Sequence, residues 1–178
     1  MTTIMKILDD TRLWAEKELC STFKFKVQPK EEFEDDNYEY KREFPKAYTL
    51  YPDLKRKYPS VTIQISESNL GGGVGVTQLT LLFAIWNNGT HFYDDADVMN
   101  FLENQDGYKD VWNWVDLSLN KILKTEYIGD YIRIRHEDKV KVAPIKDNGT
   151  IPNYYPVFGA SISFNVEHTA QQVQDEFI

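Results

Sequence analysis

The sequence has little of what common catalytic and metal-binding sites require. It contains one cysteine, Cys20, and three histidines among 178 residues. A single cysteine excludes a disulfide within the chain and agrees with a reducing compartment. No histidine opens a complete zinc-ligand pattern, because His136-Glu137 is followed at the fifth position by Val140 instead of a second histidine. We therefore expect no bound metal.

Long hydrophobic runs and an excess of positive charge are also missing. No window approaches the roughly 18 apolar residues of a membrane-spanning helix. The first residues, MTTIMKILDD, carry acidic side chains too early for a secretory signal. Twenty basic and 28 acidic residues give a formal net charge of −8, which disfavours a surface that grips nucleic acid phosphates. We expect a protein that is made in a cytoplasm and does not contact a membrane. DNA can pass by such a protein without being bound specifically.

Four of the nine glycines stand in one short stretch, NLGGGVGV, at residues 69–76. A dinucleotide-binding loop has Gly-x-Gly-x-x-Gly between a strand and a helix, so that the helix N-terminus meets the phosphate. Counted from Gly71 or from Gly73, the third glycine is missing, and the segment that follows is strand-like. We therefore expect no cofactor, and we predict that this stretch forms the wide, mobile tip of a β-hairpin. Its glycines are Gly71, Gly72, Gly73 and Gly75.

Apolar periodicity predicts two main helices and several strands. Residues 3–20 and 109–124 show helical spacing, and 61–65, 131–135, 140–142 and 160–166 alternate as strands do, whereas 76–86 is predicted to be a longer and more buried strand. A further short helix is predicted from Asp97, with Val98, Phe101 and Leu102 turned inward. Three prolines favour an extended chain over residues 44–60. The acidic run at 30–40 is interpreted as a solvated loop. Residues 167–178 are expected to be a flexible tail.

Helices and strands do not alternate one by one along the chain. This order predicts an α+β fold: a largely antiparallel or mixed β-sheet with two main helices packed on one face. Without a clear linker, residues 1–178 are expected to form a single domain.

The helix predicted from Lys109 to Lys124 carries more apolar surface than one sheet face requires. Its core face is the narrow arc of Val111, Val115, Leu119 and Ile122. Trp114 and Leu117 are interpreted as lying outside this arc. They either widen the buried face beneath a loop or form a contact between subunits.

No set of residues predicts catalysis. Ser161 lies in a predicted strand and lacks the final glycine of a nucleophile elbow. Cys20 follows a predicted helix, where the dipole raises the pKa of a thiol. The aromatic residues Tyr154, Tyr155 and Phe158 could stack on bases, but without a basic groove they are better explained as core or interface residues. We expect a protein that is not an enzyme.

Two segments together resemble a known protein family. Residues 106–113, DGYKDVWN, open the second helix, and residues 151–159, IPNYYPVFG, lead into the last strand. With the first helix and the glycine-rich hairpin, in this order, they resemble the tail terminator and tail-completion proteins of long-tailed bacteriophages. The resemblance covers the chain from the first helix to Val166. The long acidic segment 31–39 and the long hairpin depart from it.

The resemblance implies a structural virion protein that has no substrate. Such proteins form a ring, commonly a hexamer, on the head-proximal end of the tail tube, where they stop tube growth and join the tube to the head connector protein. Assembly would occur in the host bacterial cytoplasm, and the final location would be the virion tail. The candidate interface residues are Trp114, Leu117, Gly71, Gly72, Gly73, Gly75, Tyr154, Tyr155 and Phe158.

Two alternatives remain open at this point. One is a head-tail connector or stopper protein in the same particle. The other is a non-enzymatic module that binds a ligand or a protein through the aromatic residues near 154–158.

Overall fold

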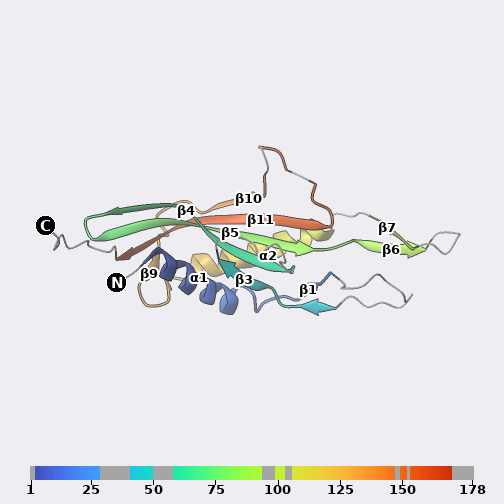
Figure 1. Ribbon diagram of the computed structural model, residues 1–178, viewed down its shortest axis with the longest axis horizontal. Helices are drawn as coiled ribbons and strands as arrows, with labels where there is room; N and C mark the ends of the chain where they lie inside the picture. Colours follow the sequence, from blue (N-terminus) through green and yellow to red (C-terminus); the bar gives the residue numbers. More distant parts are fainter. Residues whose placement is uncertain are drawn as a thin grey trace.

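A long, curled β-sheet with two helices on one side of it forms the body of the molecule (Figure 1). The computed structural model describes residues 3–28, 41–49, 58–93, 99–102, 106–146, 149–151 and 153–169. In chain order the elements are α1 (Ile4–Glu18), β1 (Phe25–Lys26), β2 (Arg42–Glu43), β3 (Lys46–Thr49), β4 (Ser60–Gly71), β5 (Val74–Trp86), β6 (Thr90–Tyr93), β7 (Met99–Leu102), α2 (Asp106–Lys124), β8 (Tyr127–Ile128), β9 (Ile132–Ile134), β10 (Lys141–Pro144) and β11 (Val157–Thr169).

The main sheet has seven strands within the described part of the chain. Their order is β3-β4-β5-β11-β9-β8, and β10 pairs with β11 on the same side as β9. β3 runs parallel to β4, whereas the other pairings in this sheet are antiparallel. β5 and β11 pair over their whole length of 13 residues each. These two strands therefore form the spine of the molecule.

Alternation along β5 and β11 directs one row of side chains into the core. Leu81 lies opposite Ile162, and both are fully buried. Because successive side chains of a strand point to opposite faces, the buried residues of both strands share the face that α1 and α2 cover. They are Leu79, Leu81, Phe83, Ile85, Phe158, Ala160, Ile162, Phe164 and Val166. The predicted α+β fold, with two helices on one face of a mixed sheet, is confirmed.

α1 begins at a side-chain cap and buries one stripe of residues. The Thr3 hydroxyl accepts a hydrogen bond from the Lys6 amide at 3.2 Å, which satisfies one of the free N–H groups at the helix start. The buried residues of the helix are Ile7, Leu8, Thr11 and Ala15, at helical spacing. The helix predicted at residues 3–20 is thus confirmed, with its end at Glu18.

Trp114 of α2 is fully buried where both helices and the sheet meet. Its indole Nε1–H donates to the carbonyl of Leu19, just after α1, at 3.0 Å. Its ring packs edge-on against Phe83 of β5 at a centroid distance of 4.8 Å, and lies 5.1 Å from the ring of Phe25 in β1. The interpretation of Trp114 as a subunit contact is therefore wrong. The chain just after α1 and the strand β1 cover Trp114, so the buried part of α2 is wider than the arc that faces the sheet.

The short helix predicted from Asp97 is also wrong. Phe101 and Leu102 lie in β7, which pairs antiparallel with β6, and Phe101 is opposite His91. Aromatic residues in both short segments favour an extended chain. Asp97 and Val98, like the acidic run at 30–40, lie outside the described residues.

The last strand continues further than the sequence predicts. β11 reaches Thr169, and its penultimate residue His168 is buried, with Nε2 2.9 Å from the Thr77 hydroxyl of β5. Residues 167–169 therefore belong to the sheet and not to a tail. The remainder of the predicted tail, 170–178, lies outside the described residues.

Truncation of Trp114 is expected to destabilise the fold strongly. Trp114→Ala removes a fully buried indole and leaves a cavity, at a cost of about 3–5 kcal/mol in the free energy of unfolding. Leu117→Ala, on the exposed side of the same helix, should cost less than about 1 kcal/mol. Urea denaturation followed by circular dichroism measures both. Equal losses for the two variants would contradict the central position of Trp114.

Candidate interaction surfaces

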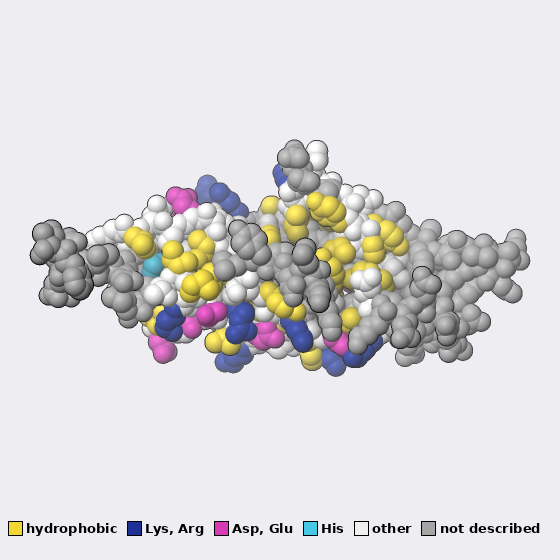
Figure 2. All heavy atoms as spheres, in the orientation of Figure 1, with side chains coloured by type: hydrophobic (Ala, Val, Ile, Leu, Met, Phe, Trp, Pro, Cys, Tyr) yellow, Lys and Arg dark blue, Asp and Glu magenta, His cyan; other side chains and the backbone are white. Residues whose placement is uncertain are grey.

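An apolar groove of about 430 Å³ opens beside the start of β11. Its lining consists of Tyr58, Leu82, Ala84, Tyr108, Ile145, Ile151, Tyr154, Val157 and Gly159, none of which is charged. Ile151 and Tyr154 at its rim are 55% and 54% exposed. Figure 2 shows hydrophobic side chains gathered over this half of the sheet. Contiguous exposed apolar surface of this kind is typical of binding sites.

The structure divides the predicted aromatic cluster among three environments. Tyr154 lines the groove. Tyr155 is partly buried, and its hydroxyl donates to the Asn88 carbonyl at 2.8 Å. Phe158 is buried on the opposite face of the sheet, under α2. Of the three, only Tyr154 therefore belongs to the exposed surface.

Most of the groove was missed at the sequence level because its residues come from two strands, the start of α2 and the chain between elements. Leu82 and Ala84 were assigned to a buried strand as a whole, although they face away from the helices. A Cβ at Gly159 would overlap the side chain of Ile145, so this glycine lets Ile145 close over the start of β11. Alternation marks Leu82 and Ala84 as outward-facing, but only the fold brings Ile145 and Ile151 beside them.

The two segments that carry the family resemblance contact each other. Gly107, in the first turn of α2, lies directly on the ring of Phe158, which a Cβ at this position would overlap. Tyr108 packs edge-on against the same ring at a centroid distance of 4.9 Å. The glycine in Asp-Gly-Tyr and the phenylalanine before Gly159 are thus two halves of one contact between α2 and β11.

The glycine-rich stretch forms a narrow turn and not the wide tip that was predicted. β4 and β5 remain paired up to Gly71 and Val74, so that only Gly72 and Gly73 lie in the turn. Both have positive φ angles, 59° and 80°, the pattern of a type I′ hairpin turn, which favours glycine. Gly75 is needed for another reason, because a Cβ there would overlap the imidazole of His168.

Leu117 lies in a second groove, of about 410 Å³, between the end of α1 and α2. It is 40% exposed. This groove contains charge: Lys121 Nζ lies 3.2 Å from the Glu18 carboxylate, and this hydrogen bond lowers the pKa of Glu18 below its usual value. Trp114, which was grouped with Leu117, does not reach this surface. The two residues therefore do not form one contact patch.

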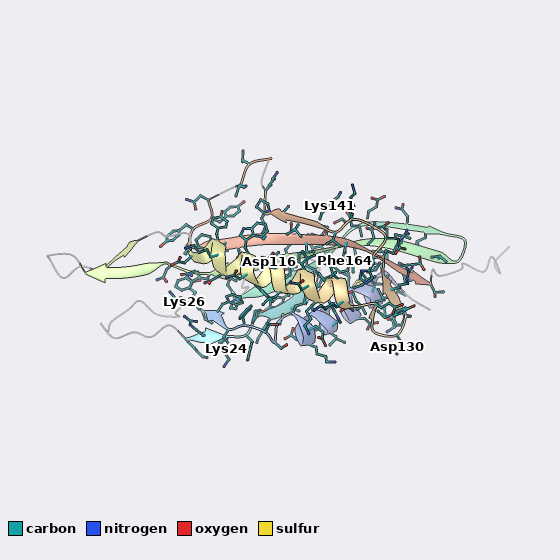
Figure 3. All side chains as sticks on the ribbon, turned by 180° about the vertical axis from the view of Figure 1, so that it is seen from behind. Lys24, Lys26, Asp116, Asp130, Lys141 and Phe164 are labelled. Atoms are coloured by element: carbon teal, nitrogen blue, oxygen red, sulfur yellow. The ribbon has the colours of Figure 1, made fainter. Side chains whose placement is uncertain are left out.

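A small basic cluster lies around β1 and β2. Figure 3 places Lys24 and Lys26 side by side there. The nearby pocket of about 200 Å³ also includes Arg42 and Asp110. Burial raises the pKa of Asp110, which accepts a hydrogen bond from Asn87 at 3.2 Å, whereas burial and the nearby Arg42 lower the pKa of Lys26. Because the pocket holds charges of both signs, it does not form a basic surface that binds phosphate groups.

The face of the sheet opposite the helices carries a chain of hydroxyl groups at the middle of β5 and β11. Ser66 and Thr80 lie 2.7 Å apart, and Thr80 and Ser163 lie 2.9 Å apart. Beyond Ile63, the outer edge of β4 pairs with no other strand in the described ranges. The middle of this face is thus polar, whereas the groove beside the start of β11 is apolar.

The described residues offer little for metal or thiol chemistry. They contain no group of three or more His, Cys, Asp or Glu side chains that could hold a metal ion. Burial, with a contribution from Glu16, raises the pKa of the Cys20 thiol to about 12. Neither of the two described helices is long and apolar enough to cross a membrane.

Comparison with known proteins assigns no family to the chain. No protein-family model matches it, and a search of curated proteins finds no significant match.

Replacement of Gly107 tests the contact between the two resemblance segments. In an isolated helix Gly→Ala stabilises by about 1 kcal/mol, but here the new methyl group overlaps Phe158. We expect Gly107→Ala to destabilise by about 1–3 kcal/mol. A double-mutant cycle with Phe158→Ala should show coupling, since the smaller residue removes the overlap. Additive losses in chemical denaturation would contradict this contact.

Cys20 is expected to be inert in the folded protein. With a pKa of about 12 it is almost entirely protonated at pH 8, and its side chain is 2% exposed. Reaction with Ellman's reagent at pH 8 should therefore be at least about a hundredfold slower than in guanidinium chloride, where the thiol is exposed and more acidic. Equal rates in the two solvents would show that Cys20 is accessible in the native state.

Proposed function

We propose that this chain is a structural virion protein: a phage tail terminator that forms a ring on the head-proximal end of the tail tube and joins it to the head connector. The observation that carries the proposal is the one-sided cover of the main sheet. Both helices pack on one face. Outward-facing residues of the other face, Leu82, Ala84, Val157 and Gly159, line an apolar groove, a surface that suits contacts with neighbouring subunits.

Sequence and charge give further support. The segments at 106–113 and 151–159 resemble the tail terminator family, and the residues that carry this resemblance, Gly107 and Phe158, pack together. A formal charge of −8 suits a ring around a DNA channel, because like charge discourages DNA from binding during passage. The basic cluster near Lys26 is small and includes Asp110.

A head-tail connector or stopper would use the same kind of surfaces, so the two roles differ in the partner. A terminator binds the end of the tube, whereas a stopper binds the connector. A ligand-binding module is the other alternative, and the groove at Tyr154 is the feature that favours it.

Tube assembly distinguishes these roles. Purified protein, added to the tail tube protein of the same phage during polymerisation, is expected to shorten the tubes and to appear as a closed ring at one end in electron microscopy. Lysozyme, added at the same concentration, should leave tube length unchanged. Binding to the head connector without binding to tubes would favour the stopper role. A protein that light scattering finds strictly monomeric, at high concentration and with tube protein present, would contradict the ring.

A further inference from the structure

Two apolar surfaces lie far apart on the main sheet. The first, which we call the hairpin tip, consists of Leu70 and Val74 on either side of the Gly72–Gly73 turn, and these two side chains are 57% and 47% exposed. The second is the groove beside the start of β11. Val74 and the groove residue Ala84 lie in one continuous strand, about 33 Å apart at the rise of an extended chain. The tip therefore cannot reach the groove of its own molecule.

The hairpin tip is thin enough to enter a groove. Gly71 and Val74 are paired, and three consecutive glycines carry no side chains beside them. Strand alternation places Leu70 and Val74 on opposite faces of this thin ribbon. The groove offers a matching environment of aliphatic side chains and tyrosine rings, with a volume of about 430 Å³. Burial of exposed aliphatic groups against such a lining favours association.

Charge favours a second copy of this chain as the occupant of the groove. Each copy carries a formal charge of −8, so that copies repel each other wherever acidic surfaces meet. Residues 68–77 contain no acidic or basic side chain, and the groove lining contains none either. Of the described acidic side chains, Glu67 and Glu167 lie beside the base of the tip: Glu67 accepts a hydrogen bond from Asn69 at 2.9 Å, and Glu167 lies opposite Val76. Tip and groove thus place apolar side chains, and not acidic ones, where two copies of this acidic protein meet.

We propose that the hairpin tip of one copy docks in the groove of the next copy. This inference names the contact between subunits in the proposed ring, and it rests on the proposed function for the closure of that ring. A contact between two different surfaces of the same chain is heterologous, so it repeats head to tail until the rotation closes. Leu70 and Val74 supply the inserted side chains, and Tyr154 and Ile151 at the rim cover them.

Substitutions on each surface test the contact. Leu70→Ser and Tyr154→Ser should each raise the concentration for half-maximal assembly about tenfold or more, because both remove apolar contacts at a buried joint. Both side chains are more than half exposed in the single chain, so the folded monomer should persist. Leu123→Ser, at a residue that is 50% exposed on α2, is the matched control and should assemble as the unaltered protein does.

Disulfide trapping identifies the occupant directly. Leu70→Cys and Tyr154→Cys chains, prepared separately and then mixed under oxidation with and without tube protein, should form a disulfide heterodimer. Neither variant alone should form a homodimer, because a heterologous contact does not place a residue beside its own copy. Cys20 is buried and will not interfere. A chain with both substitutions should give covalent oligomers that close.

Three outcomes would overturn the contact. Rings without the heterodimer would reject the tip-and-groove joint but leave the ring itself standing. Disulfides of Tyr154→Cys to a cysteine placed in the tube protein would assign the groove to the tube. The absence of any assembly, alone or with tube protein, would overturn both this contact and the proposed function.

Discussion

The seating of α2 on the β5–β11 spine is the constraint on which the rest of the structure depends. Trp114 joins α2 to the end of α1 by a hydrogen bond to Leu19, and to the sheet through Phe83. At the start of the helix, Gly107 lies against Phe158 without a side chain between them. Because protein interiors are close-packed, both helices are held to one face of the sheet, and the described residues form no third helix on the other face.

One-sided cover explains why the two halves of the open face differ. At the middle of β5 and β11, the outward positions carry hydroxyl groups, Thr80 and Ser163, which bond to each other and, through Thr80, to Ser66 of β4. Toward the start of β11, the outward positions are Leu82, Ala84 and Val157, and the chain around Ile145 and Tyr154 lines a groove over them. The same two strands thus present a polar surface at their middle and an apolar one beside the start of β11. Such a gradient fits a protein that contacts partners at one place and remains hydrated elsewhere.

Local periodicity predicted most of the fold, because alternation and helical spacing are properties of neighbouring residues. Both helices, the strands β4, β5, β9, β10 and β11 and the α+β class followed from it, whereas the short strands β1, β2, β6, β7 and β8 did not. Features that depend on distant partners were not predictable in this way. Trp114 was assigned to the surface because α1 and β1, which cover it, come from another part of the chain. His168 was assigned to a tail because its partners, Thr77 and Gly75, lie some ninety residues earlier. Of the candidate surface residues, Leu117 and Tyr154 are exposed, whereas Trp114 and Phe158 are core.

The glycine-rich stretch links local geometry to assembly. Its glycines serve different purposes: Gly72 and Gly73 adopt positive φ angles in a tight turn, whereas Gly75 makes room for His168. The result is an ordered, narrow end of the sheet, at which Leu70 and Val74 remain exposed and residues 68–77 carry no charge. In a chain with eight more acidic than basic residues, 28 against 20, an uncharged end is a surface that a like-charged copy can approach. The groove is also uncharged and lies elsewhere on the sheet, so electrostatics favours contact between the hairpin tip of one copy and the groove of another. A contact between two different surfaces of the same chain is what a head-to-tail ring requires.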